Sequence, residues 1–352
     1  MIIFVLILVA IICSGLTVAN KNEFYSDYCS PKNTNTVNAI FSILIFLSHA
    51  VTYVDLNGAF DAPYFTLRKF LGQLVVITYL FFSGYGIMES IKKKGTSYVK
   101  QMPVNRFFKL WYHFAIVIVL YTIVSVGILG KEYTLSHYLL SYTGYTTLGN
   151  SNWYMFVTFA MYIIVIVSFL VFKKSKVLAV VAVWALSIAF VIWEQYMELP
   201  VQYYNTVRCF PAGMMFSLVK PYIDKILMKN DIFWFSGFTL SVAGFAYFSQ
   251  NRNDSQIHYG LFILFALAVI VVGMMKINVK SSVLDWFGQH IFSFFILQRI
   301  PMLLARHLGY ARNGIIFILI TFFGTLFLSV IFDAAMDKLD SIVFKKRKKL
   351  KA

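Results

Sequence analysis

Residues 38–54 read NAIFSILIFLSHAVTYV, an apolar stretch of nearly membrane-spanning length that carries one imidazole, His49. An ionisable side chain inside hydrocarbon is costly, and such residues are usually functional. The alternative is a structural histidine that hydrogen-bonds to a neighbouring helix and does no chemistry. His49 is therefore the first candidate for a catalytic residue.

The composition indicates that the whole chain lives in a membrane. Of its 352 residues, 59% are hydrophobic and only 13% are charged, and the mean hydropathy is +0.73. So few charges cannot cover a soluble globule of this size, which predicts a polytopic membrane protein. The net charge of +16 comes from short Lys and Arg clusters between apolar runs. This pattern is typical of positive-inside topology and argues against nucleic acid as a partner.

Eleven apolar runs are each close to the ~20 residues that cross the hydrocarbon core. They predict an all-α transmembrane bundle, with a ten-span core and one extra N-terminal span. The runs are residues 1–19, 38–54, 70–88, 110–129, 153–172, 177–193, 204–219, 232–249, 258–275, 283–304 and 313–333. The first lacks a basic start and a small-residue cleavage site, so we interpret it as an uncleaved span, with a cleaved signal peptide as the alternative.

The basic loops set the predicted orientation. With the N-terminus outside and the C-terminus inside, 23 of the 31 Lys and Arg residues fall on the cytoplasmic side, as the positive-inside rule requires. His49 follows Asn38 by eleven residues, or about 16 Å at 1.5 Å per residue, which places it near the bilayer midplane. The expected divisions are an N-terminal helix and loop (1–36), a membrane domain (37–335) and a basic cytoplasmic tail (336–352).

No familiar metal or cofactor motif occurs. Cys13, Cys29 and Cys209 do not have the spacing of metal ligands, and the chain has no HExxH and no Gly-rich phosphate loop. No metal site and no bound cofactor are therefore expected. Any activity must be built from side chains inside the bundle.

Five segments, in this order and spacing, resemble the membrane acyltransferase-3 family over roughly residues 36–335. They are the His49 run, LFFSGYGI (80–87), NRFFKL (105–110), SNWYMFVTF (151–159) and LDWFGQHIFSFFILQRIPM (284–302). That family contains ten-span enzymes that O-acylate surface polysaccharides, lipopolysaccharide and peptidoglycan.

The resemblance implies transfer of an acyl group, usually acetyl from cytosolic acetyl-CoA, to a hydroxyl of a cell-surface polysaccharide or its lipid-linked precursor. It implies a multi-pass protein of a bacterial plasma membrane. The expected partners are the lipid bilayer, an acyl-CoA as donor substrate, a glycan acceptor and proteins of glycan assembly.

The chain departs from the family pattern at three positions. The first core span of the family carries a basic residue, ten intervening residues and a histidine; here these positions are Asn38 and His49. Donor binding at Asn38 is therefore either altered or taken over by Lys32, Arg106 or Lys109. The late span has Gln298 in place of a histidine and Phe295 in place of a tyrosine.

The chemistry of acyl transfer suits an imidazole. A base must take the hydroxyl proton in the transition state, and imidazole, with a pKa of about 6.5, does so near neutral pH. Imidazole can instead accept the acyl group and hand it on. The sequence leaves both roles of His49 open.

Cations near the inner rim fit the phosphates of a CoA donor. Arg106 and Lys109 are three residues apart and would share a helix face. The alternative for this pair is anchoring at anionic headgroups, which is also our interpretation of Lys92–Lys94.

Other residues form a second group of candidates for substrate binding. Arg68, Arg208 and Arg299 lie in or at the ends of apolar runs, where a guanidinium usually pairs with a carboxylate or faces a cavity. Trp153 and Tyr154 begin a span at the outer interface, either as an aromatic belt or as a stacking surface for the acceptor sugar. Gly84 and Gly86 are expected to permit close helix packing.

Two other functions stay open on the sequence. A transporter of lipid-linked sugars would also need polar groups around a cavity, together with inverted repeats and broken helices. A non-catalytic scaffold would have a sealed, apolar bundle. An enzyme should place His49 and at least one arginine on a single cavity that opens to the cytoplasm.

Overall fold

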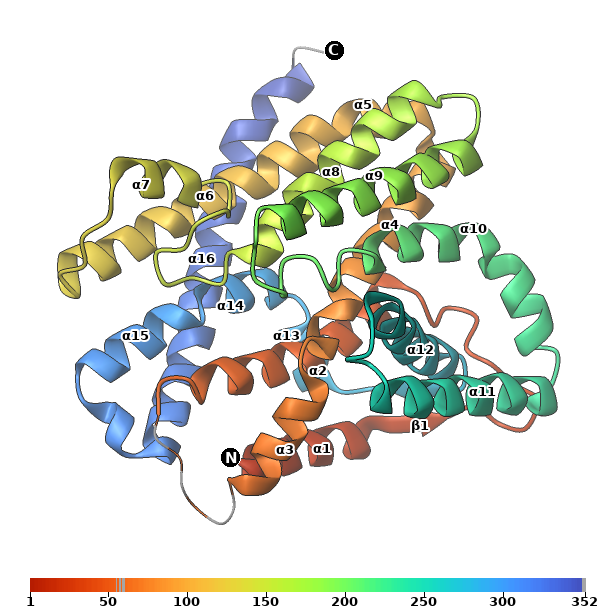
Figure 1. Ribbon diagram of the computed structural model, residues 1–352, viewed down its shortest axis with the longest axis horizontal. Helices are drawn as coiled ribbons and strands as arrows, with labels where there is room; N and C mark the ends of the chain where they lie inside the picture. The colour runs from red at the N-terminus through yellow and green to blue at the C-terminus, as the bar shows by residue number, and fades with distance from the viewer. Residues whose placement is uncertain (55, 57, 59–60, 350–352) are drawn as a thin grey trace.

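The computed structural model describes residues 1–54, 56, 58 and 61–349, and for residues 345–349 it describes the backbone alone. Its architecture is a bundle of helices (Figure 1). The first half contains α1 (Ile2–Gly15), α2 (Pro31–Ala50), α3 (Ala62–Leu71), α4 (Leu74–Lys94), α5 (Thr96–Met102), the π-helix η1 (Pro103–Phe108), α6 (Lys109–Thr122), the π-helix η2 (Ile123–Ile128), α7 (Leu135–Ser141) and α8 (Trp153–Val171). The second half contains α9 (Lys176–Tyr196), α10 (Cys209–Leu227), α11 (Asp231–Gln250), α12 (Gln256–Met274), α13 (Ser282–Phe287), α14 (Ile291–Leu297), α15 (Arg299–His307), the 3-10 helix η3 (Tyr310–Arg312) and α16 (Gly314–Lys349).

The helical bundle agrees with the predicted all-α membrane class. In the described part of the chain, seven helical segments are long and apolar enough to cross a membrane. The helix of the first predicted span, α1, has only 14 residues, fewer than the ~20 that a full crossing needs. The count of eleven spans and the orientation stay predictions.

Helix α2 has different bounds from the apolar run that predicted it. The run covers 38–54, whereas the helix begins at Pro31 and ends at Ala50. Ser30 caps its N-terminus by accepting a hydrogen bond from the Asn33 amide, and Pro31 occupies the first turn. Both are strong signals for a helix start, and they lie in a polar segment that hydropathy excludes. His49 is consequently in the last turn of α2.

The predicted span 283–304 is likewise not one helix. It is divided into α13, α14 and α15, with a turn at residues 288–290 and a second break at Gln298. The side chain of Gln298 donates to the Phe295 carbonyl at 2.7 Å, which satisfies a backbone acceptor at the break. Pro301 has no amide hydrogen, so it cannot continue the hydrogen-bond ladder across this point. Helix α2 packs against this broken segment, α4 and α16 in the middle of the bundle (Figure 1).

Helices α4 and α10 make the closest helix contact. A Cβ atom on Gly84 would lie 2.0 Å from the Phe210 carbonyl oxygen, and one on Gly213 would lie 1.9 Å from that of Phe81. Each helix thus places a glycine against the backbone of the other, and a larger residue at either position would clash. The prediction for Gly84 agrees with this packing. Gly86 has open space around its Cβ position, so its predicted packing role was wrong.

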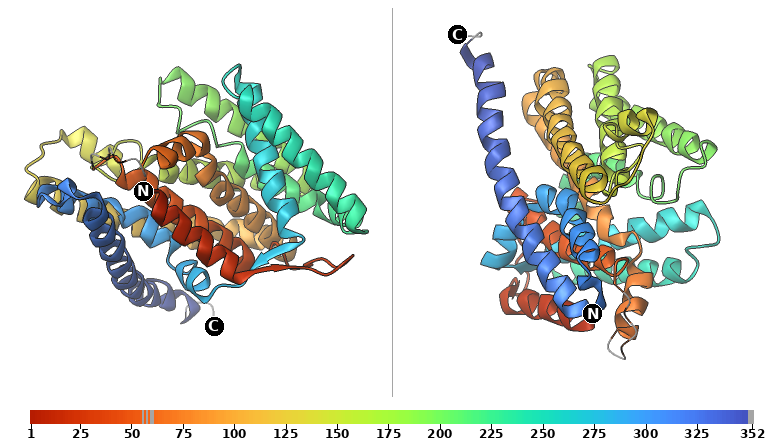
Figure 2. Two further views of the ribbon diagram at one scale, coloured as in Figure 1. Left: turned by 90° about the horizontal axis from the view of Figure 1, so that it is seen from below. Right: turned by 90° about the vertical axis from the view of Figure 1, so that its left-hand side faces the viewer.

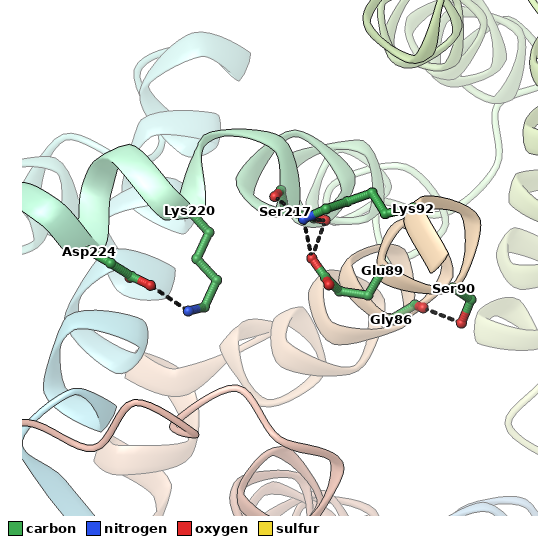
Figure 3. A network of polar contacts seen from close by, with 7 residues as sticks. All are labelled: Gly86, Glu89, Ser90, Lys92, Ser217, Lys220 and Asp224. Atoms are coloured by element: carbon green, nitrogen blue, oxygen red, sulfur yellow. Dashed lines mark hydrogen bonds and ion pairs between the residues drawn. The ribbon is translucent and has the colours of Figure 1, made fainter. Parts of the chain in front are cut away.

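A polar network continues this contact toward the ends of the two helices (Figure 3). Glu89 of α4 accepts hydrogen bonds from Lys92 Nζ at 2.6 Å and from Ser217 Oγ of α10 at 2.7 Å. One turn further along α10, Lys220 Nζ lies 2.6 Å from a carboxylate oxygen of Asp224.

Contacts between distant segments join the ends of several elements. A two-stranded antiparallel sheet pairs β1 (Leu16–Val18), at the end of the first predicted span, with β2 (Ile277–Val279), which follows α12. Three ion pairs also join distant segments: Lys32–Asp285, Lys276–Asp231 and Lys109–Asp340. The last of these holds the long helix α16, which runs along one flank of the bundle (Figure 2).

Candidate active site

One hollow, which we call the vestibule, has a volume of about 670 Å³. It is lined by the loop before α2, the C-terminal half of α4, η1 and α10. Its cations are Lys93, Arg106 and Lys220, and its acids are Asp27 and Glu89. Figure 3 shows Glu89 paired with Lys92, and Lys220 paired with Asp224. Lys93 and Arg106 are thus vestibule cations without an acidic partner among the described side chains. These two cations make the vestibule suitable for an anionic ligand.

Arg106 lies in the π-helix η1. Such helices are rare and occur frequently at functional sites. The guanidinium is exposed, and its Nε donates to the Tyr98 hydroxyl at 3.1 Å. Since a guanidinium has five N–H donors, most of them are left free to bind a phosphate.

A second hollow, of about 430 Å³, adjoins the vestibule, and we call it the deep cavity. The two hollows have Thr34, Asn35, Phe82, Ser83 and Arg106 in common. The deep cavity is further lined by Asn38, Ile45, Val76, Tyr79, Tyr154, Gly288, Gln289, Ile291, Phe292 and Phe295. Along α2 it extends from Thr34 to Ile45, or about 16 Å by helix rise, which is roughly half of a ~30 Å hydrocarbon core.

One face of α2 connects this cavity with the imidazole. Asn38, Ser42, Ile45 and His49 are spaced by four, three and four residues, so they lie in a row on one helix face. Enclosed polar atoms of three of them, Asn38 Oδ1, Ser42 Oγ and His49 Nδ1, have no hydrogen-bond partner within the described chain. Such atoms are costly unless a ligand, water or rearrangement satisfies them. The row therefore marks a polar track that continues past the cavity.

His49 itself does not line the deep cavity. The hollow ends at Ile45, which is 2% exposed, one helical turn or about 6 Å before the histidine. The sequence-based expectation of a single cavity lined by both His49 and an arginine is thus not met, because Arg106 lines the deep cavity and His49 does not. A donor group in this cavity reaches the imidazole only if Ile45 and its neighbours move.

Beyond the two hollows, the site contains a group of polar side chains that we call the His49 cluster. It is formed by His49, Ser48, Arg68, Gln298 and Arg299. Arg68 Nε donates to Ser48 Oγ at 3.0 Å, and Gln298, Arg299 and Arg68 lie close enough to act on the imidazole. Gln298 Oε1 and Arg299 Nε are enclosed without a partner among the described atoms. Nδ1 of His49 is likewise enclosed within the protein.

The remaining predicted residues lie elsewhere or have other contacts. Lys109 forms an ion pair with Asp340 of α16 and does not line either hollow. Trp153 is half-buried and packs edge-on against Tyr154, whose ring lines the deep cavity. Arg208 lines a different hollow beside α12.

The histidine–carboxylate pairs of the described structure do not include His49. They are His113 with Asp340 at 3.0 Å and His290 with Asp333 at 2.5 Å. Among the carboxylates outside these pairs, Glu194 is fully buried with both oxygens unpaired among described groups. The polar neighbours of His49 are thus cations and an amide.

Sequence reasoning missed several wall residues. Lys93 was interpreted as a membrane anchor, yet it lines the vestibule. Tyr79 donates to the Asn38 carbonyl at 2.8 Å. It was not predicted because nothing in the sequence distinguishes it from the other aromatic residues of its run. Cys29 also lines the vestibule, and burial raises the pKa of its thiol to about 12. The thiol is therefore protonated at neutral pH and is not a nucleophile.

Comparison with protein families assigns the chain to a known family. Residues 34–334 match the family model of an acyltransferase domain, that of the acyltransferase-3 family. The match covers most of the chain, so the protein belongs to this family of membrane acyltransferases, and the resemblance found from the sequence is confirmed. No curated protein and no solved structure matches the chain.

Proposed function

We propose that the protein is an integral membrane O-acyltransferase. It transfers an acyl group, acetyl in the first instance, from cytosolic acyl-CoA to a hydroxyl of a cell-surface polysaccharide or its lipid-linked precursor. The main support is the pair of adjoining hollows, which run from a cationic vestibule along α2 to within one turn of His49. The expected location is a bacterial plasma membrane.

The vestibule is assigned to the CoA moiety. Its unpaired cations, Lys93 and Arg106, would bind phosphates, and charge-assisted hydrogen bonds from a guanidinium are among the stronger polar contacts. The thioester end would then extend into the deep cavity, where Asn38 Oδ1 and Ser42 Oγ lack partners among described groups. In this arrangement Asn38 contacts the donor as a neutral polar residue in place of the basic residue of the family pattern.

The reaction has two forms that balance. In the direct form, the hydroxyl oxygen of the acceptor bonds to the thioester carbonyl carbon, His49 takes the hydroxyl proton, and the C–S bond breaks to release CoA thiolate, which is then protonated. In the relay form, a ring nitrogen of His49 bonds to the thioester carbonyl carbon and displaces CoA thiolate. The acceptor hydroxyl oxygen then bonds to the acyl carbon and displaces the imidazole, and the hydroxyl proton passes to the thiolate. In either form, Arg299 and Gln298, which act on the imidazole, would supply the donors that stabilise the developing oxyanion.

Replacement of His49 tests the proposal directly. His49→Ala should reduce acyl transfer from radiolabelled acetyl-CoA to membrane glycan by at least ~100-fold, the lower range for loss of a general base. The control is His137→Ala, because His137 is a half-buried residue that lines neither hollow and contacts the Thr147 carbonyl at 2.9 Å. Retained transfer in a folded His49→Ala protein would remove His49 from the mechanism.

One observation favours a second candidate, transport of a lipid-linked sugar. The break between α13 and α14 brings Gly288 and Gln289 to the wall of the deep cavity, and transporters commonly bind substrates at broken helices. Proteoliposomes distinguish the two functions. An enzyme consumes acetyl-CoA in proportion to acylated glycan, whereas a transporter moves the lipid-linked sugar across the bilayer without acetyl-CoA.

A further inference from the structure

A separate cleft lies between α10 and α12, on the other side of α4 from the deep cavity. It consists of two adjoining hollows, of about 570 and 240 Å³, that have Trp184, Ala212, Leu264 and Leu267 in common. We call it the lateral cleft. Phe81 is the α4 residue on its wall, and helical spacing places Phe81 on the face opposite Tyr79 and Ser83.

The body of the lateral cleft is apolar and open to the side of the protein. All fifteen residues that line the larger hollow are aliphatic, aromatic or methionine. Met215, Ile226 and Leu264 on its rim are each at least 50% exposed. Along α10 the cleft extends from Arg208 to Leu227, or about 28 Å by helix rise, close to the ~30 Å of a hydrocarbon core. These features fit hydrocarbon chains supplied by the bilayer.

The other end of the cleft is polar and cationic. Arg208 lines it at the N-terminus of α10, with one donor directed at the Gln256 carbonyl at 3.3 Å. Trp184 Nε1 and Asn205 Oδ1, on the same hollow, are enclosed without partners among described groups. An arginine, an indole donor and an amide acceptor fit a phosphodiester with a hydroxyl-bearing headgroup.

We propose that the lateral cleft is a binding site for one anionic glycerophospholipid of the surrounding bilayer, of the phosphatidylglycerol type. Its phosphate binds Arg208 and Trp184, a headgroup hydroxyl donates to Asn205, and its acyl chains lie against α10 and α12. Arg208 is among the eight Lys and Arg residues outside the predicted cytoplasmic set, so positive-inside anchoring does not explain it. The site is independent of the proposed acyl transfer.

Tryptophan fluorescence tests the site in the full-length chain. The protein is placed in phosphatidylcholine nanodiscs with rising fractions of brominated phosphatidylglycerol or brominated phosphatidylcholine. In the unmodified protein, quenching should reach half its maximum at an approximately tenfold lower fraction of the anionic lipid, the effect of one charge-assisted hydrogen bond. Arg208→Gln should abolish this preference. Trp184→Phe should remove the part of the quenching that Trp184 reports.

Arg252→Gln is the matched control. Arg252 is another predicted outer-side arginine, and it donates to the Phe70 and Lys69 carbonyls instead of lining the cleft. This variant should retain the lipid preference. Ala212→Phe, which fills the segment common to both hollows, should lose it while the protein still elutes as a single species.

Three results would overturn the proposal. Equal quenching by both brominated lipids would show no selective site. Equal loss in Arg252→Gln and Arg208→Gln would reduce the effect to net charge. Displacement of brominated phosphatidylglycerol by a polyprenyl phosphate at lower fractions than by unlabelled phosphatidylglycerol would assign the cleft to a different lipid.

Discussion

The deep cavity and the lateral cleft flank the same helix, α4, and differ in almost every physical property. The deep cavity is lined by amide, hydroxyl and guanidinium groups and adjoins a cationic vestibule. The lateral cleft is apolar over most of its length, with a single arginine at one end. The first suits a polar ligand from water and the second suits hydrocarbon, although both lie in a chain that is 59% hydrophobic.

The two regions differ in where their polar atoms lie, and not in the size of their hollows. The two main hollows, of about 430 and 570 Å³, are similar in volume. Along the α2 row, three enclosed polar atoms lack partners among described groups, and each would destabilise the fold unless something occupies the track. The body of the lateral cleft needs only an apolar occupant.

The glycine contact holds α4, the helix that lines both regions, against α10, and breaking it should have the largest effect. Gly84→Leu should destabilise the protein by more than the ~1–3 kcal/mol typical of overpacking, because its Cβ would meet backbone and not a movable side chain. Thermal unfolding in detergent measures this. Gly86→Leu is the control, since its Cβ position is open. Equal losses of stability in both variants would show that the glycine contact is not the cause.

Arg106→Ala should separate the two regions functionally. We expect about a tenfold rise in the KM for acyl-CoA, from the loss of one charge-assisted contact, with no change in the anionic lipid preference of the lateral cleft. Lys100→Ala removes an equally charged, exposed side chain from the neighbouring helix α5 and should leave the KM unchanged. An unchanged KM in Arg106→Ala would remove the vestibule from donor binding.

Cys29 offers a smaller test of the vestibule wall. Because burial raises its thiol pKa to about 12, the thiolate fraction near pH 8 is far below that of an ordinary thiol with a pKa of about 8.5. A variant that retains only Cys29 should therefore react with maleimide much more slowly than glutathione does. Its rate should rise about tenfold per pH unit up to about pH 12. A rate that levels off near pH 9 would show an exposed, ordinary thiol.

Several features of the site were predictable because their signals are local. Hydropathy identified the membrane class, five short segments identified the acyltransferase-3 family, and the His49 run stood out as a polar group in an apolar stretch. Arg106 was predicted near the inner rim, and the structure places it where the two hollows meet. Gly84 was expected to pack closely, and it does.

Other features had no local signal. Lys109 resembles Arg106 in charge and position, and only the approach of α16 pairs it with Asp340. Gly86 resembles Gly84, yet it faces open space because it lies two residues further around the helix. Ser30 and Pro31 are a sequence signal for the start of α2, but the predicted span was defined by hydropathy, which excluded their polar segment.

The sequence by itself determined a helical membrane protein of the acyltransferase-3 family with an imidazole in its first core helix, because hydropathy, charge distribution and short motifs are properties of neighbouring residues. Only the tertiary structure decided that the cavity stops at Ile45, that a broken segment forms its wall, and that a lipid-shaped cleft lies behind α4. A hollow is the space left between helices far apart in the chain. Its shape depends on how those helices pack, which no single segment encodes.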